Sequence, residues 1–177
     1  MFDSSYPFIK VACKKTYTHN NYIKTHVYRF KSDKAVYICE VEEYASDIFV
    51  IKFYRKCDRL SPNKYSILTH EGNCTKIVST CINILLSILL KINNASFGFL
   101  GSNTVTNTFI EEKKNTIRFR IYKNAMENLV GDSVFTHAMD VSHSTYLMIN
   151  KLNTLEDEFL NGAKQMFEDI FPALETN

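Results

Sequence analysis

The stretch ASFGFLGSNTVTNTFIEEKKNTIRFRIYKNAMENLVG, residues Ala95–Gly131, decides how the rest of the chain is interpreted. It begins with a short apolar run, Ala95–Leu100, bounded by an asparagine and a glycine, which is typical of a buried central strand. A polar loop, Ser102–Lys114, follows, and the next segment carries two arginines and a tyrosine. Polar and basic groups delivered beside the end of a buried strand are a common way of building a site in α/β proteins.

The segment after this loop, Asn115–Val130, fits two periods. Apolar side chains alternate with polar ones at its start, as they would in a strand. Apolar residues then recur every four positions to its end: Ile117, Ile121, Ala125 and Leu129. Because Gly131 is also a typical C-terminal stop, we predict a helix here, with a strand over 115–122 as the alternative.

Upstream, the sequence predicts an antiparallel meander and a buried helix. Three segments rich in β-branched and aromatic residues are separated by short turns: Tyr22–Phe30, Ala35–Tyr44 and Ile48–Tyr54. Phe8–Cys13 is ambiguous between an edge strand and irregular structure, and Tyr65–Thr69 is interpreted as a further short extended piece. Cys74–Ile92 has a wide apolar stripe at helical spacing, with Asn73 as its N-cap.

Two strands over 134–139 and 145–149 and an amphipathic helix over about 155–171 complete the prediction. The resulting order is β-β-β-α-β-α-β-β-α. This order predicts an α+β fold in which a single, largely antiparallel sheet is flanked by helices. No repeat or linker interrupts the chain, so we expect residues 1–177 to form one domain.

Composition limits the class of protein. Hydrophobic residues make up 45% of the 177 residues, which is enough for a full core without metal or disulfide staples. The net charge is only +2, but residues 1–70 hold 12 Lys/Arg against 7 Asp/Glu. Five cysteines without metal-ligand spacing predict mostly buried thiols in a reducing compartment and no metal site. No apolar stretch is long enough to span a membrane, so we expect a cytoplasmic protein.

The predicted order resembles the core of the GNAT family, the acetyl-coenzyme-A-dependent N-acetyltransferases, over roughly residues 22–151. In that family a meander leads to a helix whose N-terminus holds the coenzyme pyrophosphate, and a central strand, a second helix and two closing strands follow. The second helix often starts with Asn and carries Leu-Tyr six and seven residues later. Asn115, Ile121 and Tyr122 fall at those spacings. The resemblance implies that Tyr122 is the general acid that returns a proton to the coenzyme thiolate.

The sequence departs from the family at the phosphate loop, whose pattern is Q/R-x-x-G-x-G/A. The corresponding stretch, His70–Thr75, retains Gly72 and Asn73 as candidate ligand-binding residues but places Glu71 where phosphates would lie. The bulky Arg118 replaces the small residue usual three positions after Asn115. We therefore expect the fold without a bound cofactor, with acetyl-CoA as the alternative. The chain also resembles small uncharacterised proteins of Bacteroidetes, which implies no activity.

Two groups of residues are candidates for a site. Arg118 and Arg120, with Lys123, form a basic group that could hold a phosphate or carboxylate; surface pairing with glutamates is the alternative. His137, beside a Ser-x-Tyr pair on a predicted hairpin, is a candidate acid or base, as in small ribonuclease toxins, and a purely structural histidine is the alternative. For Tyr122 the alternative is a core aromatic.

These observations predict a small cytoplasmic GNAT-like domain of unknown activity. We expect it to act through a protein partner or a second copy of itself, or through an anionic ligand held near Arg118 and Arg120. The alternatives are an active acyl-CoA-dependent N-acyltransferase and an RNA-directed, toxin-like protein. The sequence leaves open whether any reaction is catalysed.

Overall fold

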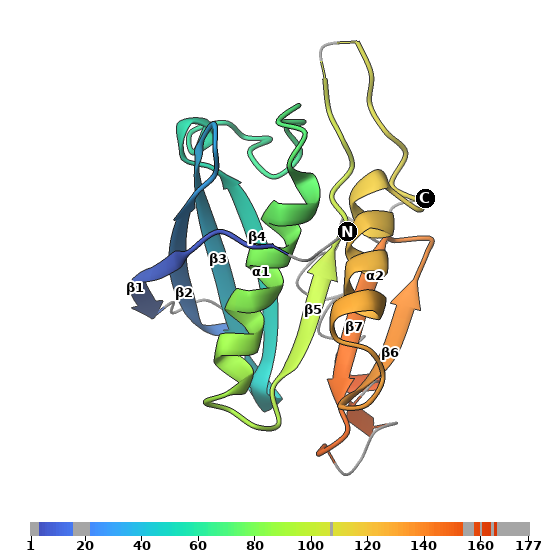
Figure 1. Ribbon diagram of the computed structural model, residues 1–177. Coiled ribbons are helices and arrows are strands. Elements are labelled where there is room, and N and C mark those ends of the chain that lie inside the picture. Colours follow the sequence, from blue (N-terminus) through green and yellow to red (C-terminus); the bar gives the residue numbers. More distant parts are fainter. Residues whose placement is uncertain are drawn as a thin grey trace.

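The computed structural model describes residues 4–15, 22–106, 108–153 and, toward the C-terminus, 158–159, 161–163 and 165. In this part of the chain, seven strands form one sheet in the order β1-β2-β3-β4-β5-β7-β6 (Figure 1). β4 and β5 run parallel, and every other neighbouring pair is antiparallel. The strands are Phe8–Lys15 (β1), Tyr22–Lys31 (β2), Val36–Tyr44 (β3), Ile48–Arg55 (β4), Ser96–Leu100 (β5), Phe135–Asp140 (β6) and Thr145–Asn150 (β7). The α+β class and the largely antiparallel sheet are therefore confirmed.

Two α-helices, Cys74–Leu89 (α1) and Ile117–Leu129 (α2), lie side by side on one face of the sheet (Figure 1). The main core fills the space between these helices and the sheet. Its largest fully buried side chains are mostly aromatic and come from both halves of the chain: Tyr37, Phe49, Phe97, Phe119, Phe135 and Tyr146. Burial of this apolar surface is the main stabilising contribution, at about 25 cal/mol per Å².

A smaller apolar cluster lies on the opposite face of the sheet. It joins side chains of β3, β4 and β7 to one from the C-terminal part of the chain: Tyr44, Ile48, Val50, Leu147, Ile149 and Ala163. The described residues between 158 and 165 are helical, and the remainder of the helix predicted over 155–171 lies outside the described residues. Among the described residues, no helix has the length and apolarity needed to cross a membrane.

The central parallel pair is short, and this shapes the site. β4 and β5 pair from Ile48–Ser96 to Ile51–Phe99. β4 then continues to Arg55, whereas β5 ends at Leu100, one residue after the last residue that pairs with β4. The two strands therefore separate at one end of the sheet. The segment 56–73, which leads from β4 to α1, and the loop 101–116, which leads from β5 to α2, meet at this end.

The helical prediction for residues 115–130 is confirmed, and the strand alternative for 115–122 is excluded. α2 begins at Ile117, and its N-cap is Thr116, whose Oγ1 accepts a hydrogen bond from Phe119 N at 3.2 Å. Asn115 lies outside the helix with φ of 52°. The cap position therefore falls one residue later than the GNAT-type spacing implied.

One open alternative is decided, and two other predictions are corrected. β1 is a full strand, so the observed order of elements has one strand more at its N-terminal end than the predicted order. Six of its eight residues are exposed, so its sequence lacks the alternation of apolar and polar residues that indicates a strand. Tyr65–Thr69 belongs to no strand, because Ser66 N donates to Asn63 O at 2.8 Å in a turn. Asn73 stands at the N-cap position of α1, but its side chain makes no cap bond and instead donates to Asp33 Oδ2 at 2.9 Å.

Candidate functional site

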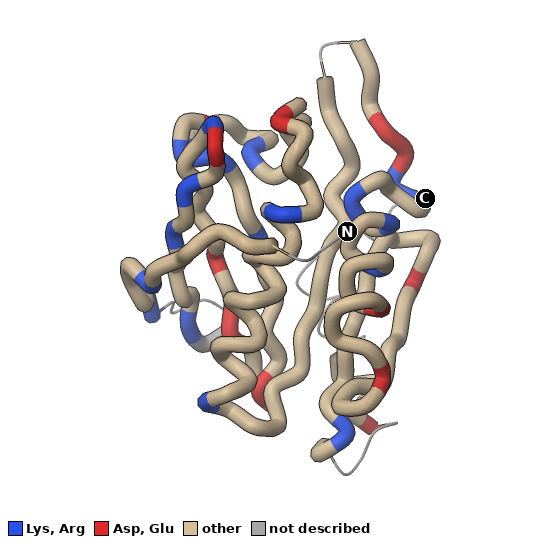
Figure 2. The backbone as a smooth tube through the Cα atoms, in the orientation of Figure 1, with Lys and Arg blue, Asp and Glu red and all other residues tan. Residues whose placement is uncertain are grey.

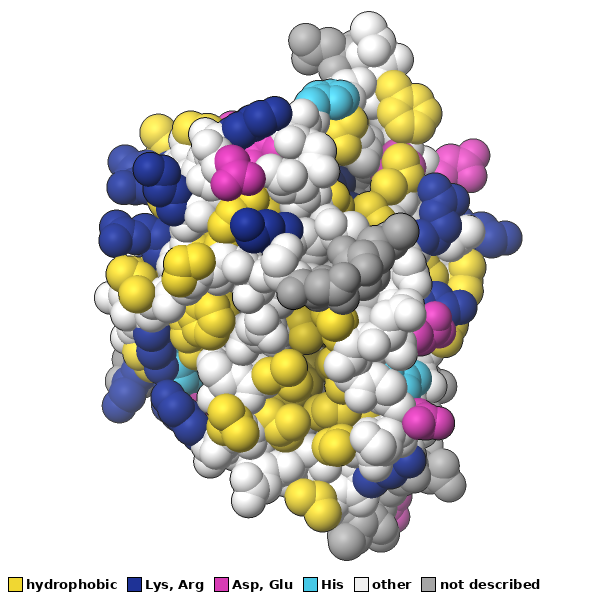
Figure 3. All heavy atoms as spheres, viewed as in Figure 1, with side chains coloured by type: hydrophobic (Ala, Val, Ile, Leu, Met, Phe, Trp, Pro, Cys, Tyr) yellow, Lys and Arg dark blue, Asp and Glu magenta, His cyan; other side chains and the backbone are white. Residues whose placement is uncertain are grey.

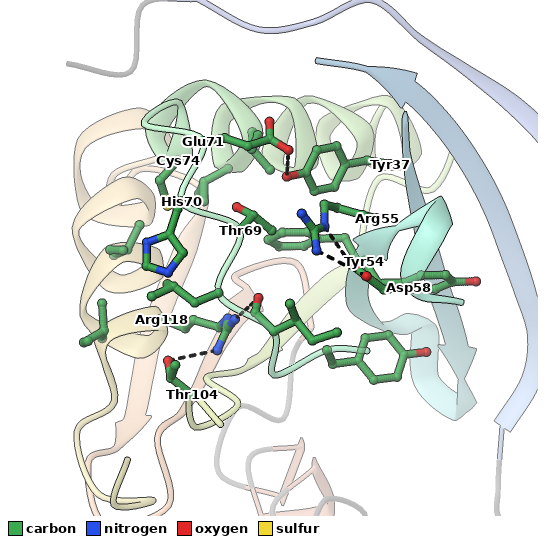
Figure 4. A pocket seen from close by; sticks show the side chains of 18 of the residues that line it. Tyr37, Tyr54, Arg55, Asp58, Thr69, His70, Glu71, Cys74, Thr104 and Arg118 are labelled. Atoms are coloured by element: carbon green, nitrogen blue, oxygen red, sulfur yellow. Dashed lines mark hydrogen bonds and ion pairs between the residues drawn. The ribbon is translucent and has the colours of Figure 1, made fainter. Parts of the chain in front are cut away.

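Two adjoining cavities lie where β4 and β5 separate. The larger has a volume of about 260 Å³ and is walled by the end of β4, the segment 64–72 and the first turns of α1 and α2 (Figure 4). The smaller, of about 240 Å³, lies in the gap between the two strands. Phe53, Tyr65 and Tyr122 line both. The walls are mainly aromatic and aliphatic, with a few charged groups, which is the usual composition of a small-molecule site.

The start of α2 is fixed against the end of β5, and this places the side chains of its first turn. A Cβ on Gly101 would lie 2.6 Å from Phe119 Cβ, so glycine permits the close approach of helix and strand. Thr116 Oγ1 donates to Gly101 O at 2.7 Å. The Glu111 carboxylate accepts from Ile117 N at 2.7 Å and from Thr104 N at 2.8 Å. Burial acts to raise the pKa of Glu111, but these hydrogen bonds and the nearby Arg118 outweigh it and lower that pKa.

Arg118 connects three segments at the cavity wall (Figure 4). Its Nη2 donates to Ile67 O at 2.8 Å, and its Nη1 donates to Ser102 O at 3.2 Å and to Thr104 Oγ1 at 3.3 Å. The side chain is partly buried. The guanidinium therefore holds the segment from β4 to α1 against the loop from β5 to α2, across the mouth of the gap between the strands.

Glu71 is turned away from the start of α1. It is buried, with Oε1 accepting from Tyr37 OH at 2.9 Å (Figure 4) and Oε2 accepting from Ser32 Oγ at 2.8 Å. Gly72 follows with φ of +76°, a conformation that glycine adopts without strain. The candidate residues Gly72 and Asn73 thus form the turn between this anchored carboxylate and α1, and only Gly72 lines the larger cavity.

Tyr122 is a buried side chain whose ring packs against Phe53 and Phe99. Burial raises the pKa of its phenol well above the ordinary value, although Arg118 acts in the opposite direction. The phenol therefore stays protonated at neutral pH and can donate a hydrogen bond. Among the described residues it has no hydrogen-bond partner, so its O–H is free for a ligand in either cavity.

Arg118 lines the larger cavity, but Arg120 and Lys123 do not lie beside it there. Residues 118 and 120 lie about 200° apart around a helix, and Arg120 is exposed. Lys123 forms an ion pair with Glu127 at 3.8 Å, on the outer surface. Figure 2 shows that the basic charge of the N-terminal part instead gathers along the β1–β2 edge of the sheet, whose segment 8–31 holds six Lys/Arg and no Asp/Glu.

His137 lies at the other end of α2. Its Nε2 donates to Gly131 O at 2.6 Å and its Nδ1 is 2.7 Å from Tyr146 OH. Both ring nitrogens are therefore engaged in bracing β6 and β7 against the end of the helix. Arg118 and Gly131 are 13 residues apart, or about 20 Å along the helix, so the arrangement does not bring Arg118 and His137 into one site.

Three further charged side chains, which no sequence pattern singles out, border the larger cavity: Arg55, Asp58 and Lys64. Arg55 donates from Nε to Asp58 Oδ2 at 2.6 Å and from Nη2 to Oδ1 at 3.2 Å (Figure 4). Lys64 lies over the rings of Tyr54 and Tyr65. The many tyrosines in this part of the sequence indicate an aromatic surface. Which of the tyrosines face each other depends on strand register and on the path of the segment after β4.

Hydrophobic side chains also reach the surface on and beside the loop that projects from the body of the protein (Figure 3). Leu68 is 42% exposed and Ile117 is 41% exposed, and both line the cavity. Phe109 and Ile110, in the projecting loop, are 55% and 69% exposed.

The cysteines and other metal-binding side chains do not assemble. Cys39 and Cys81 are buried with their sulfurs 3.5 Å apart, but Cys13, Cys57 and Cys74 are exposed, so the prediction that most are buried is wrong. Within the described ranges, no group of three or more His, Cys, Asp and Glu side chains could hold a metal ion.

No protein-family model, curated protein or solved structure matches the chain.

Proposed function

We propose that the chain is a GNAT-like domain that binds a small ligand with an apolar body and one anionic group, and that it does not transfer acetyl groups. The observation that carries this proposal is the cavity where β4 and β5 separate, with Arg118 and Tyr122 in its wall. Aromatic and aliphatic side chains would hold the body of the ligand, and the two donors would hold its anionic group.

The succession of elements supports the GNAT-like part of the proposal. A meander, β1–β4, leads to α1; a central strand, β5, leads to α2; and β6 and β7 close the sheet. This succession is compatible with the one that the family resemblance implies. The cavity lies between the start of α1 and the start of α2, the region to which the resemblance assigns the coenzyme.

Two contacts argue against acetyl-CoA as the ligand. Glu71 precedes the turn into α1, and its carboxylate, although turned toward Tyr37 and Ser32, adds a negative charge near the helix start at which the phosphates of the coenzyme would need to bind. Arg118 holds the Ile67 carbonyl across the gap, so the chain's own segment 64–70 occupies space that an extended pantetheine arm would need. The contact between Arg118 and Ile67 would have to break before the coenzyme could enter.

Arg118 nevertheless retains donors for a smaller anion. Among the described residues its Nε has no acceptor, and Nη2 uses one of its two hydrogens. The unpaired O–H of Tyr122 lines the same cavity. A carboxylate or phosphate contacting both groups would receive charge-assisted hydrogen bonds, each worth about 1.5–3 kcal/mol.

A thermal-shift titration tests this proposal. Phenyl phosphate is the probe, benzyl alcohol its uncharged control and acetyl-CoA the competing ligand. Phenyl phosphate should raise the melting temperature, because a ligand that binds only the native state stabilises it, whereas benzyl alcohol and acetyl-CoA should not. Arg118→Lys, which keeps the charge but loses the planar donors, should weaken this response. Arg120→Lys, its exposed neighbour, should behave like the wild type.

Active acyl transfer is the second candidate, and one observation favours it. The phenol of Tyr122 is protonated, unpaired and inside the cavity, as a general acid for a departing thiolate would need to be. If acetyl-CoA raises the melting temperature and Tyr122→Phe abolishes that effect, this candidate replaces the proposal above. If no probe changes the melting temperature, both are wrong.

A further inference from the structure

Two tyrosines beside the larger cavity form a pair of perpendicular walls. Tyr54 lies on β4 and Tyr65 on the segment that follows it; their ring centroids are 5.5 Å apart and their planes meet at 85°. The ammonium of Lys64 lies 4.2 Å from the centroid of the Tyr54 ring and 4.8 Å from that of Tyr65. Both distances are within the range in which a cation is attracted to an aromatic face.

Glu40, on β3, supplies the negative charge of this cage. Its Oε2 accepts from Tyr65 OH at 2.6 Å, and its Oε1 accepts from Tyr54 OH at 3.3 Å. Burial, and to a smaller extent the charge and hydrogen bond of Glu40, raises the pKa of the Tyr54 phenol to about 12 and that of the Tyr65 phenol further. Both hydroxyls therefore stay protonated and donate to the carboxylate. Glu40 therefore fixes the two rings through their hydroxyl groups.

The ammonium of Lys64 is poorly matched to this surrounding. It lies 3.9 Å from Glu40 Oε2, an ion-pair distance that is too long for a hydrogen bond. A lysine ammonium carries three N–H donors and is strongly hydrated, whereas this cage offers a charge and two ring faces. Each carboxylate oxygen of Glu40 already accepts one hydrogen bond from a tyrosine hydroxyl, and the ammonium of Lys64 adds none at hydrogen-bond distance to Oε2.

A cation without N–H donors suits the same surroundings better. A methylated ammonium carries the same charge, loses less hydration on entering, and contacts aromatic faces through its methyl groups. Tyr54, Lys64 and Tyr65 all line the larger cavity, so a ligand in that cavity reaches the cage directly.

We propose that Tyr54, Tyr65 and Glu40 form a binding site for a quaternary ammonium group, and that Lys64 occupies it until such a ligand displaces it. The site is independent of the function proposed above, since it needs neither an anionic group on the ligand nor the donors of Arg118. It assigns a second chemical class of ligand to the wall of the same cavity.

Choline and neohexanol, its uncharged carbon isostere, test this proposal in NMR titrations that follow the ring resonances of Tyr54 and Tyr65. In the wild type, choline should shift both sets of resonances and neohexanol should not. Lys64→Ala should bind choline about tenfold more tightly or better, because the competing ammonium is gone. Lys56→Ala removes an exposed lysine that does not line the cavity and is the matched control.

Two variants made in the Lys64→Ala background separate the cage from general charge effects. Tyr65→Leu removes one wall and Glu40→Gln removes the charge, and each should reduce choline binding to the level of neohexanol. A backbone amide spectrum confirms that each variant is folded. The proposal is overturned if choline leaves the wild-type ring resonances unchanged, if choline and neohexanol act alike, or if Lys64→Ala binds choline no more tightly than Lys56→Ala.

Discussion

Replacing Arg118 by methionine isolates the contribution of its guanidinium to the closed gap between β4 and β5. The change removes one short hydrogen bond, to Ile67 O at 2.8 Å, and two longer ones, to Ser102 O at 3.2 Å and Thr104 Oγ1 at 3.3 Å. A bond to a charged group contributes about 1.5–3 kcal/mol, but the two longer bonds and partial exposure reduce the sum. We expect a loss of about 2–4 kcal/mol, with methionine retaining the packing of the aliphatic stem.

Urea unfolding of the variant measures this loss directly. For a domain of this size, about 2–4 kcal/mol corresponds to a fall in melting temperature of roughly 4–16 °C. Arg120→Met is the control: Arg120 is exposed on the same helix and should change stability by less than about 0.5 kcal/mol. Equal unfolding midpoints and slopes for the two variants would refute the idea that Arg118 ties the two loops together.

Three further predictions concern the elements that support the site. Glu111→Gln should be less stable than the wild type above about pH 5, because the pKa of the Glu111 carboxyl is lowered in the folded state. The stabilisation from this carboxylate is present above its unfolded pKa, about 4.3, and is lost as the pH falls through its folded pKa. A difference in urea unfolding between variant and wild type that does not change with pH would contradict this. Gly101→Ala should cost about 1–3 kcal/mol because its Cβ would lie 2.6 Å from Phe119 Cβ, whereas Gly162→Ala, with open space around it, should cost almost nothing in the same melting experiment. Leu85→Asp should unfold the protein, since Leu85 is only 1% exposed; a native circular dichroism spectrum with an unchanged melting curve would show that the core is assigned wrongly.

The parts of the fold that were predictable are those in which burial imposes a period on the sequence. α1 has one broad apolar face, and β4 and β5 are nearly continuous apolar runs, because the helices and the sheet bury them. The sequence of β1 is ambiguous because β1 is an edge strand with most side chains in solvent, so its sequence carries little alternation. The order of the strands within the sheet and the short extent of the β4–β5 pairing depend on tertiary register, which no local pattern encodes.

The site was predictable only in part, because its contacts are distant in sequence. Arg118 was selected from its charge, but its acceptor at Ile67 is 51 positions away. Its separation from Arg120, by contrast, follows from helix geometry as soon as the helix is chosen over the strand. Asn73 has the residue type of an N-cap, yet its amide bonds to Asp33, 40 positions away. The cage of Tyr54 and Tyr65 likewise depends on Glu40 from a neighbouring strand.

The central claim is that the cavity between α1 and α2 accepts a small anion and excludes the coenzyme. Isothermal titration calorimetry of the wild-type protein with phenyl phosphate and with acetyl-CoA in the same buffer tests it most directly. We predict saturable binding of phenyl phosphate that is weakened in Arg118→Lys, and no binding of acetyl-CoA with a dissociation constant of about 1 mM or lower, a threshold of only ~4 kcal/mol. Saturable binding of acetyl-CoA that is lost in Tyr122→Phe would contradict the account.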